Sequence, residues 1–564
     1  MAENERSCQN CKKEFAIEIA DLDFYRAMDV PPPTFCPACR FQRRLSFLNV
    51  MTLYKRKCDL CGVEKLSIFS PDKPFVVYCP PCWFSDRWDA MDHAREYDPS
   101  KNFFEQLGEL QKKVPTLGLF GNYPTLVNSP YNNYVYALKN CYFLFDSGNA
   151  ENCHYSLMLK DSKDSMDCSV VEGNERCYEN IVADKSYNVH FSEDFAECRN
   201  VYFSKHVKSC TDCFGCVNLR HKQYHIFNEP YSKSDYEKKI KEFRLDSFRE
   251  LEKMKERAAA FWLRFPQKFM HGSHNVDVSG EYIYFSKNAH DCYMVDEVED
   301  SRWVQLTIFD GAKRCYDYTS GGFNAEYNYE HISGAASNRV RFSFGADDSL
   351  NADYSMDLIS CQDMLGCIGL RKKSYCILNK QYGKEDYQKL RSVILDDLKK
   401  NPYRDRAGRV FGYGEFFPYD LSYFDYNETQ AQDFFPLART DIEAREWRWK
   451  EPVGKEHTIT LNALDLPDAI GDVPDTITSE VIECRACRRA YHIISAELAL
   501  LREFGFALPR ECFWCRNARR FSRLNPPRFH QRACMKCGKE ITTAYDPSRP
   551  DIVYCEECYL AEVA

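Results

Sequence analysis

The middle of the chain consists of short strand-like pieces that follow one another closely. From about residue 138, many of these pieces end in Asn, Asp, Glu or Arg followed by cysteine, at Cys141, Cys153, Cys168, Cys177 and Cys198. With Val189 counted in the series, alternate members lie 21 to 27 residues apart, about the length of one coil of a parallel β-helix. Cysteine suits the interior of such coils because it is small and apolar. The pattern predicts a β-helix-like solenoid, with a β-sandwich or another β-rich sheet as the alternative.

The same pattern occurs twice. The segment FGCVNLRHKQYHIFNEPYSKSDYEKKI, from Phe214, aligns without gaps with LGCIGLRKKSYCILNKQYGKEDYQKLR, from Leu365. In each copy a strand-like piece passes into a charged helix. In the first copy Ser234 and Glu237 have capping-box spacing, and the helix is expected to continue to about Phe265. We therefore predict two strand sets, over 131–229 and 273–380. The segments around 131–243 and 273–394, each ending in a strand followed by a helix, should superpose on each other.

Changes in composition divide the chain into six predicted parts. Residues 88–130 mix charged and aromatic residues and are expected to be partly helical, whereas 401–483 is aromatic and then acidic. The parts are an N-terminal module (1–87), a helical connector (88–130), a first β-solenoid with its helix (131–265), a second β-solenoid with its helix (266–400), a linker (401–483) and a C-terminal module (484–564).

The composition limits the class of protein. The 564 residues are 44% hydrophobic, enough for several buried cores. The first residues lack the apolar stretch of a signal peptide, and no run of about 18 apolar residues occurs. We therefore expect a cytoplasmic protein without a membrane partner. In such a chain 29 cysteines indicate metal binding rather than a disulfide framework.

Sixteen of the cysteines form eight Cys-x-x-Cys pairs, four near each end of the chain. The gaps between successive pairs are 24, 18 and 17 residues in both sets, and chance does not produce that agreement. The first set is Cys8/Cys11, Cys36/Cys39, Cys58/Cys61 and Cys79/Cys82, and the second is Cys484/Cys487, Cys512/Cys515, Cys534/Cys537 and Cys555/Cys558.

Zinc explains this spacing best. A Cys-x-x-Cys turn presents two thiolates on one side of a loop, and two such turns complete the four-sulfur shell of structural zinc. Redox-active pairs, the alternative, do not usually come in matched sets of four. We predict about four zinc ions per chain, from all sixteen cysteines. Sequential pairing, the first pair with the second and the third with the fourth, is favoured over a cross-braced arrangement.

The segments CQNCKKEFAIEIADLDFYRAMDVPPPTFCPACRFQRR and CRACRRAYHIISAELALLREFGFALPRECFWCRNARR resemble zinc-binding domains of the treble-clef or zinc-ribbon kind. The whole chain resembles uncharacterised cysteine-rich proteins of very small uncultivated bacteria, a likeness that implies no known activity. The fold class expected is thus multidomain and mainly β. Two terminal double-zinc-ribbon or treble-clef modules would flank a duplicated β-helix-like solenoid with interspersed helices.

The charge argues against a protein that coats DNA in general, because the chain carries a net charge of −9 and the middle, between the two modules, carries −16. The C-terminal module nevertheless has 14 Lys and Arg against 9 Asp and Glu. A local basic face is predicted there and in the N-terminal module, through Arg516, Arg519 and Arg520 and through the matching Arg40, Arg43 and Arg44. The alternative is that these arginines pack against the zinc knuckles. RNA or a ribonucleoprotein is the partner expected first, with a protein partner second.

The chain shows no P-loop, no Gly-x-Gly-x-x-Gly, no His-Glu-x-x-His and no Gly-x-Ser-x-Gly. Four thiolates close a zinc shell, so these zinc sites offer no catalytic position. We expect a non-enzymatic zinc-binding scaffold or interaction protein. An enzyme acting on carbohydrate through Asp146, Asp161 or Asp310 is the alternative, and Cys210, Cys213 and Cys216 are a weaker candidate for a fifth metal with His221 or His225.

Overall fold

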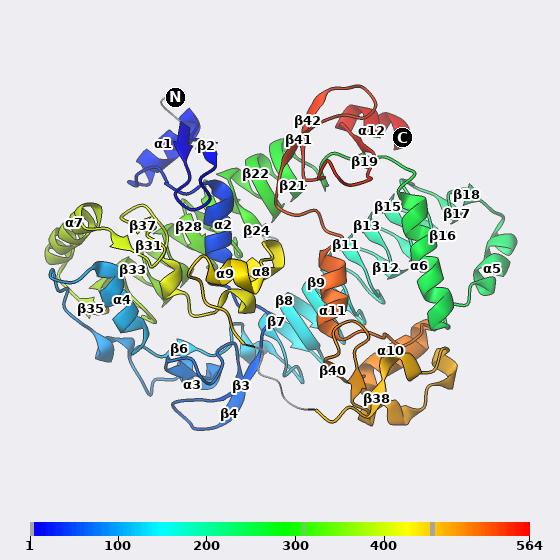
Figure 1. Cartoon of the computed structure of the whole chain (residues 1–564), viewed down its shortest axis with the longest axis horizontal. Helices are drawn as coiled ribbons and strands as arrows, with labels where there is room; N and C mark the ends of the chain where they lie inside the picture. Colours follow the sequence, from blue (N-terminus) through cyan, green and yellow to red (C-terminus); the bar gives the residue numbers. More distant parts are fainter. Residues whose placement is uncertain (1–4, 308–310, 452–456, 564) are drawn as a thin grey trace.

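The computed structural model describes residues 5–307, 311–451 and 457–563 and is mainly β, with twelve α-helices in these ranges (Figure 1). Two sets of mainly parallel strands, called the first and second stacks, fill the middle, and the last strand of each set is antiparallel to its neighbour. The first stack is β7 (Asn133–Lys139), β8 (Tyr142–Glu151), β9 (His154–Lys163), β10 (Ser169–Glu172), β11 (Ile181–Asp184), β12 (Tyr187–His190), β13 (Glu193–Ala196), β14 (Arg199–Tyr202), β15 (Lys205–Lys208), β16 (Thr211–Phe214), β17 (Gln223–Ile226) and β18 (Glu229–Pro230), in two sheets.

The second stack is a single sheet of 16 strands. They are β20 (Gly272–Ser273), β21 (Val276–Tyr284), β22 (Lys287–Asp296), β23 (Glu299–Arg302), β24 (Gln305–Thr307), β25 (Ala312–Lys313), β26 (Tyr316–Thr319), β27 (Ala325–Glu326), β28 (Tyr329–Ile332), β29 (Asn338–Arg341), β30 (Phe344–Asp347), β31 (Leu350–Asp353), β32 (Met356–Ile359), β33 (Gln362–Leu365), β34 (Ser374–Ile377) and β35 (Lys380–Gln381).

Stacked residues in the first stack are twelve positions apart. Ile181 lies beside Ser169 in one parallel pair and beside Glu193 in the next. The sequence predicted a step of 21 to 27 residues. That estimate was too long because it followed five cysteines and Val189, whereas serine, alanine and further valines take the same interior positions.

A period of three underlies the twelve-residue step. From residue 132 to residue 216 every third side chain is buried, and from 134 to 215 the residue before each buried one has a positive φ. The left-handed residue turns the chain so that the next side chain points inward, which gives four interior positions in twelve residues. Interior serines satisfy the backbone: the Ser156 hydroxyl accepts from the Cys168 amide at 3.0 Å and donates to the His154 carbonyl.

Both stacks end in the same way, as the internal alignment predicts. Asn228 and Asn379 have φ of 68° and 64°, and each side chain bonds both the amide and the carbonyl of one residue eleven positions earlier, Val217 or Ile368. The chain then enters α5 (Lys233–Glu242) after the first stack and α7 (Lys384–Lys400) after the second. The helix expected to reach Phe265 is broken: Ser232, not Ser234, caps α5, and Ser247 caps a separate helix, α6 (Phe248–Trp262).

The two terminal modules, residues 5–87 and 484–563, repeat one series of elements. The N-terminal module contains β1 (Glu5–Ser7), β2 (Glu14–Ala16), α1 (Ile19–Ala27), α2 (Pro37–Leu45), β3 (Tyr54–Lys57), β4 (Glu64–Ser67), β5 (Val77–Tyr78) and α3 (Pro80–Trp83). The C-terminal module contains β40 (Ala490–Tyr491), α10 (Ser495–Phe504), α11 (Phe513–Phe521), β41 (His530–Ala533), β42 (Glu540–Thr543), β43 (Val553–Tyr554) and α12 (Glu556–Val563). Strand β39 (Ile482–Glu483) comes directly before this module.

Each module lies against the stack that is remote from it in sequence. Helix α2 of the N-terminal module packs on β26 and β28 of the second stack, while α11 of the C-terminal module lies on the first stack (Figure 1). Short parallel pairs tie each module to the strand just before the other stack. These pairs are β5 with β6 (Thr116–Leu117) and β43 with β19 (Gln267–Lys268).

Much of the segment predicted as a linker belongs to the core. Phe416, Phe417 and Tyr423 are buried, and Tyr419 stacks on Trp447 with ring centroids 4.3 Å apart. The segment lies between α2 and α4 (Phe103–Gln111), because Ser422 donates to the carbonyl of Ser46 and Gln111 donates to the carbonyl of Leu421. The helices not yet placed are α4 (Phe103–Gln111), α8 (Gln430–Phe434) and α9 (Arg439–Glu443).

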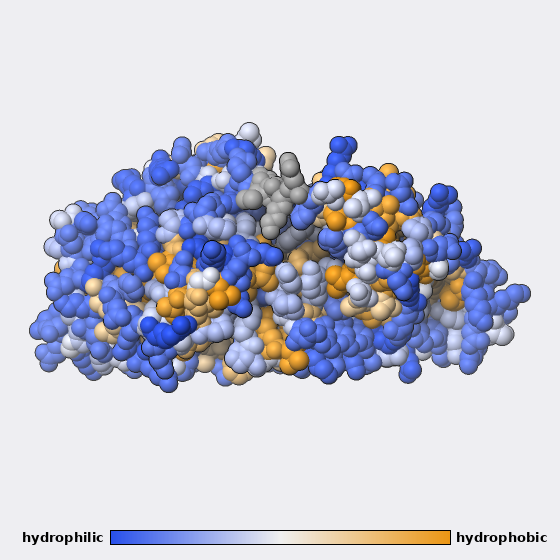
Figure 2. Space-filling model, turned by 90° about the horizontal axis from the view of Figure 1, so that it is seen from below, coloured by the Kyte–Doolittle hydropathy of each residue, from blue (hydrophilic) through white to orange (hydrophobic). Residues whose placement is uncertain are grey.

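The surface in Figure 2 is mostly hydrophilic, with hydrophobic residues in small groups near the middle. Among the described residues, none of the helices is both long and apolar enough to cross a membrane.

Candidate metal centres

The sixteen paired cysteines gather into four groups of four, and the pairing is sequential. The groups are Cys8/Cys11/Cys36/Cys39, Cys58/Cys61/Cys79/Cys82, Cys484/Cys487/Cys512/Cys515 and Cys534/Cys537/Cys555/Cys558, each with its sulfurs within 4.8 Å of one another. Tetrahedral coordination with metal–sulfur bonds of about 2.3 Å places sulfurs about 3.8 Å apart. The Sγ–Sγ distances of Cys11–Cys36, Cys61–Cys79, Cys487–Cys512 and Cys537–Cys555 are 3.7, 4.0, 3.6 and 3.8 Å. All four groups therefore fit a metal ion such as zinc.

The local backbone explains why each site forms. Four residues after the first cysteine, the chain adopts a left-handed conformation at Lys12, Gly62, Arg488 and Gly538, which closes the knuckle. The amide of the third cysteine then donates to the first sulfur, at 3.2 Å for Cys36 to Cys8 and 3.3 Å for Cys79 to Cys58. The matching amides of Cys512 and Cys555 do the same.

These amides favour the thiolate that a metal requires. Burial alone would raise the pKa of Cys534, but hydrogen bonds from the backbone at Cys555, Cys537 and Lys536 lower it to about 6. The pKa of Cys58 and that of Cys484 are lowered to about 7 by the same balance of burial and backbone hydrogen bonds. The first cysteine of these knuckles is thus prepared to bind a cation near neutral pH.

The arginines predicted to form a basic face in the N-terminal module lie inside the protein. Arg40, Arg43 and Arg44 on α2 are fully buried. Their partners are acidic residues of distant segments. Arg40 and Arg44 donate to Asp317 at 2.8 and 3.1 Å, and Arg43 and Arg44 donate to Glu330 at 2.8 and 3.0 Å. With Glu415 beside Arg43 at 3.1 Å, three guanidinium groups face three carboxylates.

The C-terminal module repeats this arrangement on the first stack. Arg516 and Arg520 on α11 are buried and donate to Asp167 at 2.5 and 2.7 Å, and Arg516 also donates to Glu497 at 3.0 Å. Arg519 is 36% exposed and paired with Glu179 and Glu511. Buried charges must be paired to be tolerated, so these arginines attach the modules to the stacks. They do not form an exposed surface for phosphate.

The sequence also offered three cysteines as a fifth metal site and three aspartates as catalytic residues. Cys210, Cys213 and Cys216 occupy consecutive interior positions of the first stack, where each Sγ donates to backbone carbonyls. Among the described residues they are not grouped with a histidine as a metal site. Asp161 is exposed beside Asn149, and burial raises the pKa of Asp146 to about 7. Asp310 lies outside the described residues.

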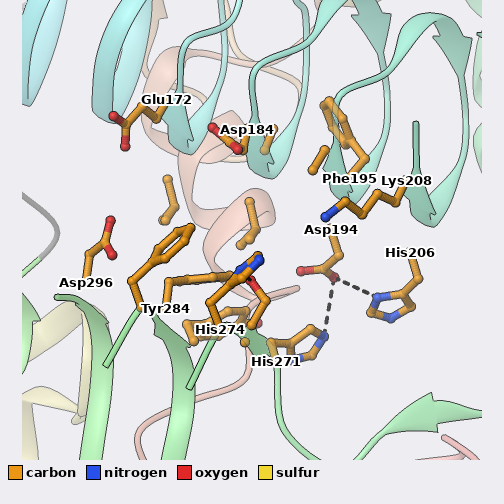
Figure 3. A pocket seen from close by; sticks show the side chains of 18 of the residues that line it. Glu172, Asp184, Asp194, Phe195, His206, Lys208, His271, His274, Tyr284 and Asp296 are labelled. Carbon is orange, nitrogen blue, oxygen red and sulfur yellow. Dashed lines mark hydrogen bonds and ion pairs between the residues drawn. The ribbon is translucent and has the colours of Figure 1, made fainter. Parts of the chain in front are cut away.

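A cleft of about 560 Å³ lies between the two stacks and next to α12 of the C-terminal module (Figure 3). One wall is a column of the first stack at twelve-residue intervals: Met158, Val170, Val182, Asp194 and His206. Residues around β20–β22 form the opposite wall, which includes His274, Tyr284 and Asp296. The volume falls in the range of small-molecule sites.

One end of this cleft carries a group that the sequence did not indicate. Asp194 on β13, His206 on β15 and His271 between β19 and β20 converge there, with one ligand atom from each within 4.8 Å of the others (Figure 3). Burial lowers the pKa of His206 to about 3. Burial alone would also lower the pKa of His271, but the negative charges of Asp194 and Glu281 raise that pKa to about 10. The twelve-residue period brings two of the three members together, because Asp194 and His206 are twelve positions apart.

Comparisons with known proteins give no family for this chain. No family model matches it, and no curated protein sequence matches it. Among solved structures, a putative acetyltransferase from Desulfovibrio desulfuricans G20 is similar over 51% of this chain and 74% of its own, with 10% sequence identity and a TM-score of 0.13. A TM-score this low carries no argument about fold or function.

Proposed function

We propose that this chain is a zinc-dependent binding scaffold, in which four zinc ions hold two β-helix-like solenoids together around a ligand cleft. Zinc is the metal we infer, because it prefers closed tetrahedral shells of thiolate. The succession of knuckle, hairpin and a helix that begins at the second cysteine pair supports a treble-clef-like assignment for the modules.

The observation that carries this proposal is the composition of the cleft walls. Each stack contributes one wall, and Tyr559 and Leu560, directly after the metal ligand Cys558, line the edge. The distance between the walls therefore depends on both stacks and on one zinc centre. Tyr559 also donates to Asn218 of the first stack at 3.0 Å, which couples that centre to the wall.

The ligand we infer is small rather than macromolecular. The cleft mixes apolar side chains such as Val170 and Phe195 with carboxylates such as Glu172 and Asp184, as small-molecule sites do. The arginines on which the RNA prediction rested are buried in ion pairs or bound to carboxylates. An RNA or protein partner stays a prediction that requires a different surface.

Native mass spectrometry tests the proposal directly. Protein purified with zinc and without denaturant should carry a small molecule that is lost when the cleft is filled by Ser273→Trp, since Ser273 is an exposed residue of its lining. Ser234→Trp, at an exposed position on α5, is the matched control and should keep the molecule. A chain of apo mass in every preparation, with no small molecule raising its melting temperature in a ligand screen, would contradict the proposal.

A further inference from the structure

The Asp194, His206 and His271 group differs chemically from the four thiolate sites. It offers two imidazoles and one carboxylate, and their side chains are 14%, 9% and 7% exposed, with Asp194 and His206 lining the cleft. The Oδ2 atom of Asp194 is 3.9 Å from Nδ1 of His206 and 3.4 Å from Nε2 of His271. Ligands in adjacent positions on an ion with bonds of about 2.1 Å are about 3 Å apart. Small side-chain adjustments would therefore bring the three atoms around one ion.

Hydrogen bonds behind the group orient both rings as metal ligands. The Nε2 atom of His206 lies 2.6 Å from the side-chain oxygen of Gln267, and Nδ1 of His271 lies 2.5 Å from a Glu281 oxygen. Because oxygen accepts in both contacts, the nitrogen that faces away from Asp194 carries a proton in each ring. Metal-binding histidines are held in this way by outer partners.

The opposite nitrogen of His206 then faces a carboxylate without a hydrogen bond. Its Nδ1 presents a lone pair towards Oδ2 of Asp194 at 3.9 Å, too far and with the wrong polarity for a hydrogen bond. The other oxygen of Asp194 is buried and has no hydrogen-bond partner. A cation between the three side chains would satisfy all of these atoms together.

The surroundings favour a cation with two positive charges. His271 lies between two carboxylates, Asp194 and Glu281. Lys205, which lies beside Glu193 in the parallel register of β13 and β15, is paired with that residue at 3.1 Å. A divalent ion would balance the two carboxylates around His271.

We propose that Asp194, His206 and His271 bind one first-row divalent metal ion whose remaining positions face the cleft and take an oxygen-donor ligand. Two histidines and one carboxylate leave open positions on the ion, the arrangement used for Fe2+. The four thiolate centres, in contrast, are closed. This inference rests on the proposed binding cleft for its second ligand, but the metal itself does not depend on that proposal.

Cobalt titration of the zinc-loaded full chain under anaerobic conditions tests the metal site. We expect one Co2+ per chain beyond the four zinc ions, with weak d–d bands and no thiolate-to-cobalt charge transfer. His206→Gln and Asp194→Asn should abolish this binding, and Gln267→Leu should weaken it about 10- to 100-fold. His274→Asn is the matched control, because His274 lines the same cleft outside the group.

The outcomes separate the two parts of the proposal. Acetate, an oxygen donor, added to the cobalt protein should change the d–d bands if open positions face the cleft, and unchanged bands would overturn that part. Absence of a fifth metal in protein that keeps four zinc ions would overturn the site, as would equal binding by His206→Gln and His274→Asn. Zinc content and circular dichroism of each variant show that a loss of cobalt is not a loss of fold. Failure of the scaffold proposal would instead appear in the native mass spectra.

Discussion

Asp167 and Asp317 occupy equivalent places in the two halves of the molecule. Each carboxylate accepts from two arginines that are four residues apart on a module helix. Two residues later in each strand stack, a hydroxyl accepts from Nε of the second arginine: Ser169 from Arg520 at 3.2 Å and Thr319 from Arg44 at 3.0 Å. The duplication therefore includes the interface between module and stack as well as the metal sites.

Neutralising either aspartate should loosen one module. In Asp317→Asn or Asp167→Asn two buried guanidinium groups lose their shared carboxylate, and breaking a buried pair typically costs about 3–5 kcal/mol. We expect a large fall in melting temperature in both variants with zinc content unchanged. Glu326→Gln, in an exposed pair with Arg314, is the control and should cost about 1 kcal/mol or less. Variants that melt like wild type would contradict the role given to the two aspartates.

Charge reversal at Arg520 tests whether this arginine attaches the C-terminal module to the first stack or binds RNA. Arg520→Glu places a second carboxylate beside buried Asp167, so we expect lower thermal stability and release of the C-terminal module to proteases. Arg528→Glu, at an exposed position of the same module, should leave both unchanged. If Arg520→Glu instead kept its stability and weakened RNA binding in a filter assay, the earlier prediction of a basic face would be correct.

Metal content should follow the four cysteine groups. Elemental analysis of metal-replete protein should give about four zinc ions per chain, one for each group of four ligands. Cys58→Ser should lose one ion and disorder mainly the β3–β4 hairpin. Cys153→Ala, a buried cysteine outside the groups, should keep all four. Two or fewer ions in the wild type would refute the two-module arrangement.

One buried carboxyl should give stability a measurable pH dependence. Burial raises the pKa of Asp357 from its ordinary 3.8 to about 7, so between these values the folded state holds a proton that the unfolded state releases. The stabilisation that this proton gives the folded state is fully present below pH 3.8. It is lost as the pH rises towards 7, and the free energy of unfolding falls by up to about 4 kcal/mol. Asp357→Asn should therefore raise the melting temperature more at pH 8 than at pH 6. Exposed Asp348→Asn is the control, and a gain independent of pH would argue against the raised pKa.

The sequence predicts those features whose chemistry is local. Cys-x-x-Cys spacing indicates a metal knuckle because both ligands lie in one turn, and the gapless alignment locates the shared stack ends at Asn228 and Asn379. The role of Arg44 was not predictable in this way, since its partner Asp317 is 273 residues away. The period of three was missed because left-handed backbone at non-glycine residues such as Asp194 and His206 leaves no clear mark in composition.

The docking of each module on the stack remote from it in sequence has a consequence during synthesis. At about 5–20 residues per second, roughly 14–55 seconds separate the synthesis of Arg44 from that of Asp317, its partner 273 residues later. For that interval the N-terminal module can bind zinc while the arginines of α2 face solvent with no carboxylate to meet them. A newly made chain thus carries a temporary basic surface on α2 that the finished protein conceals.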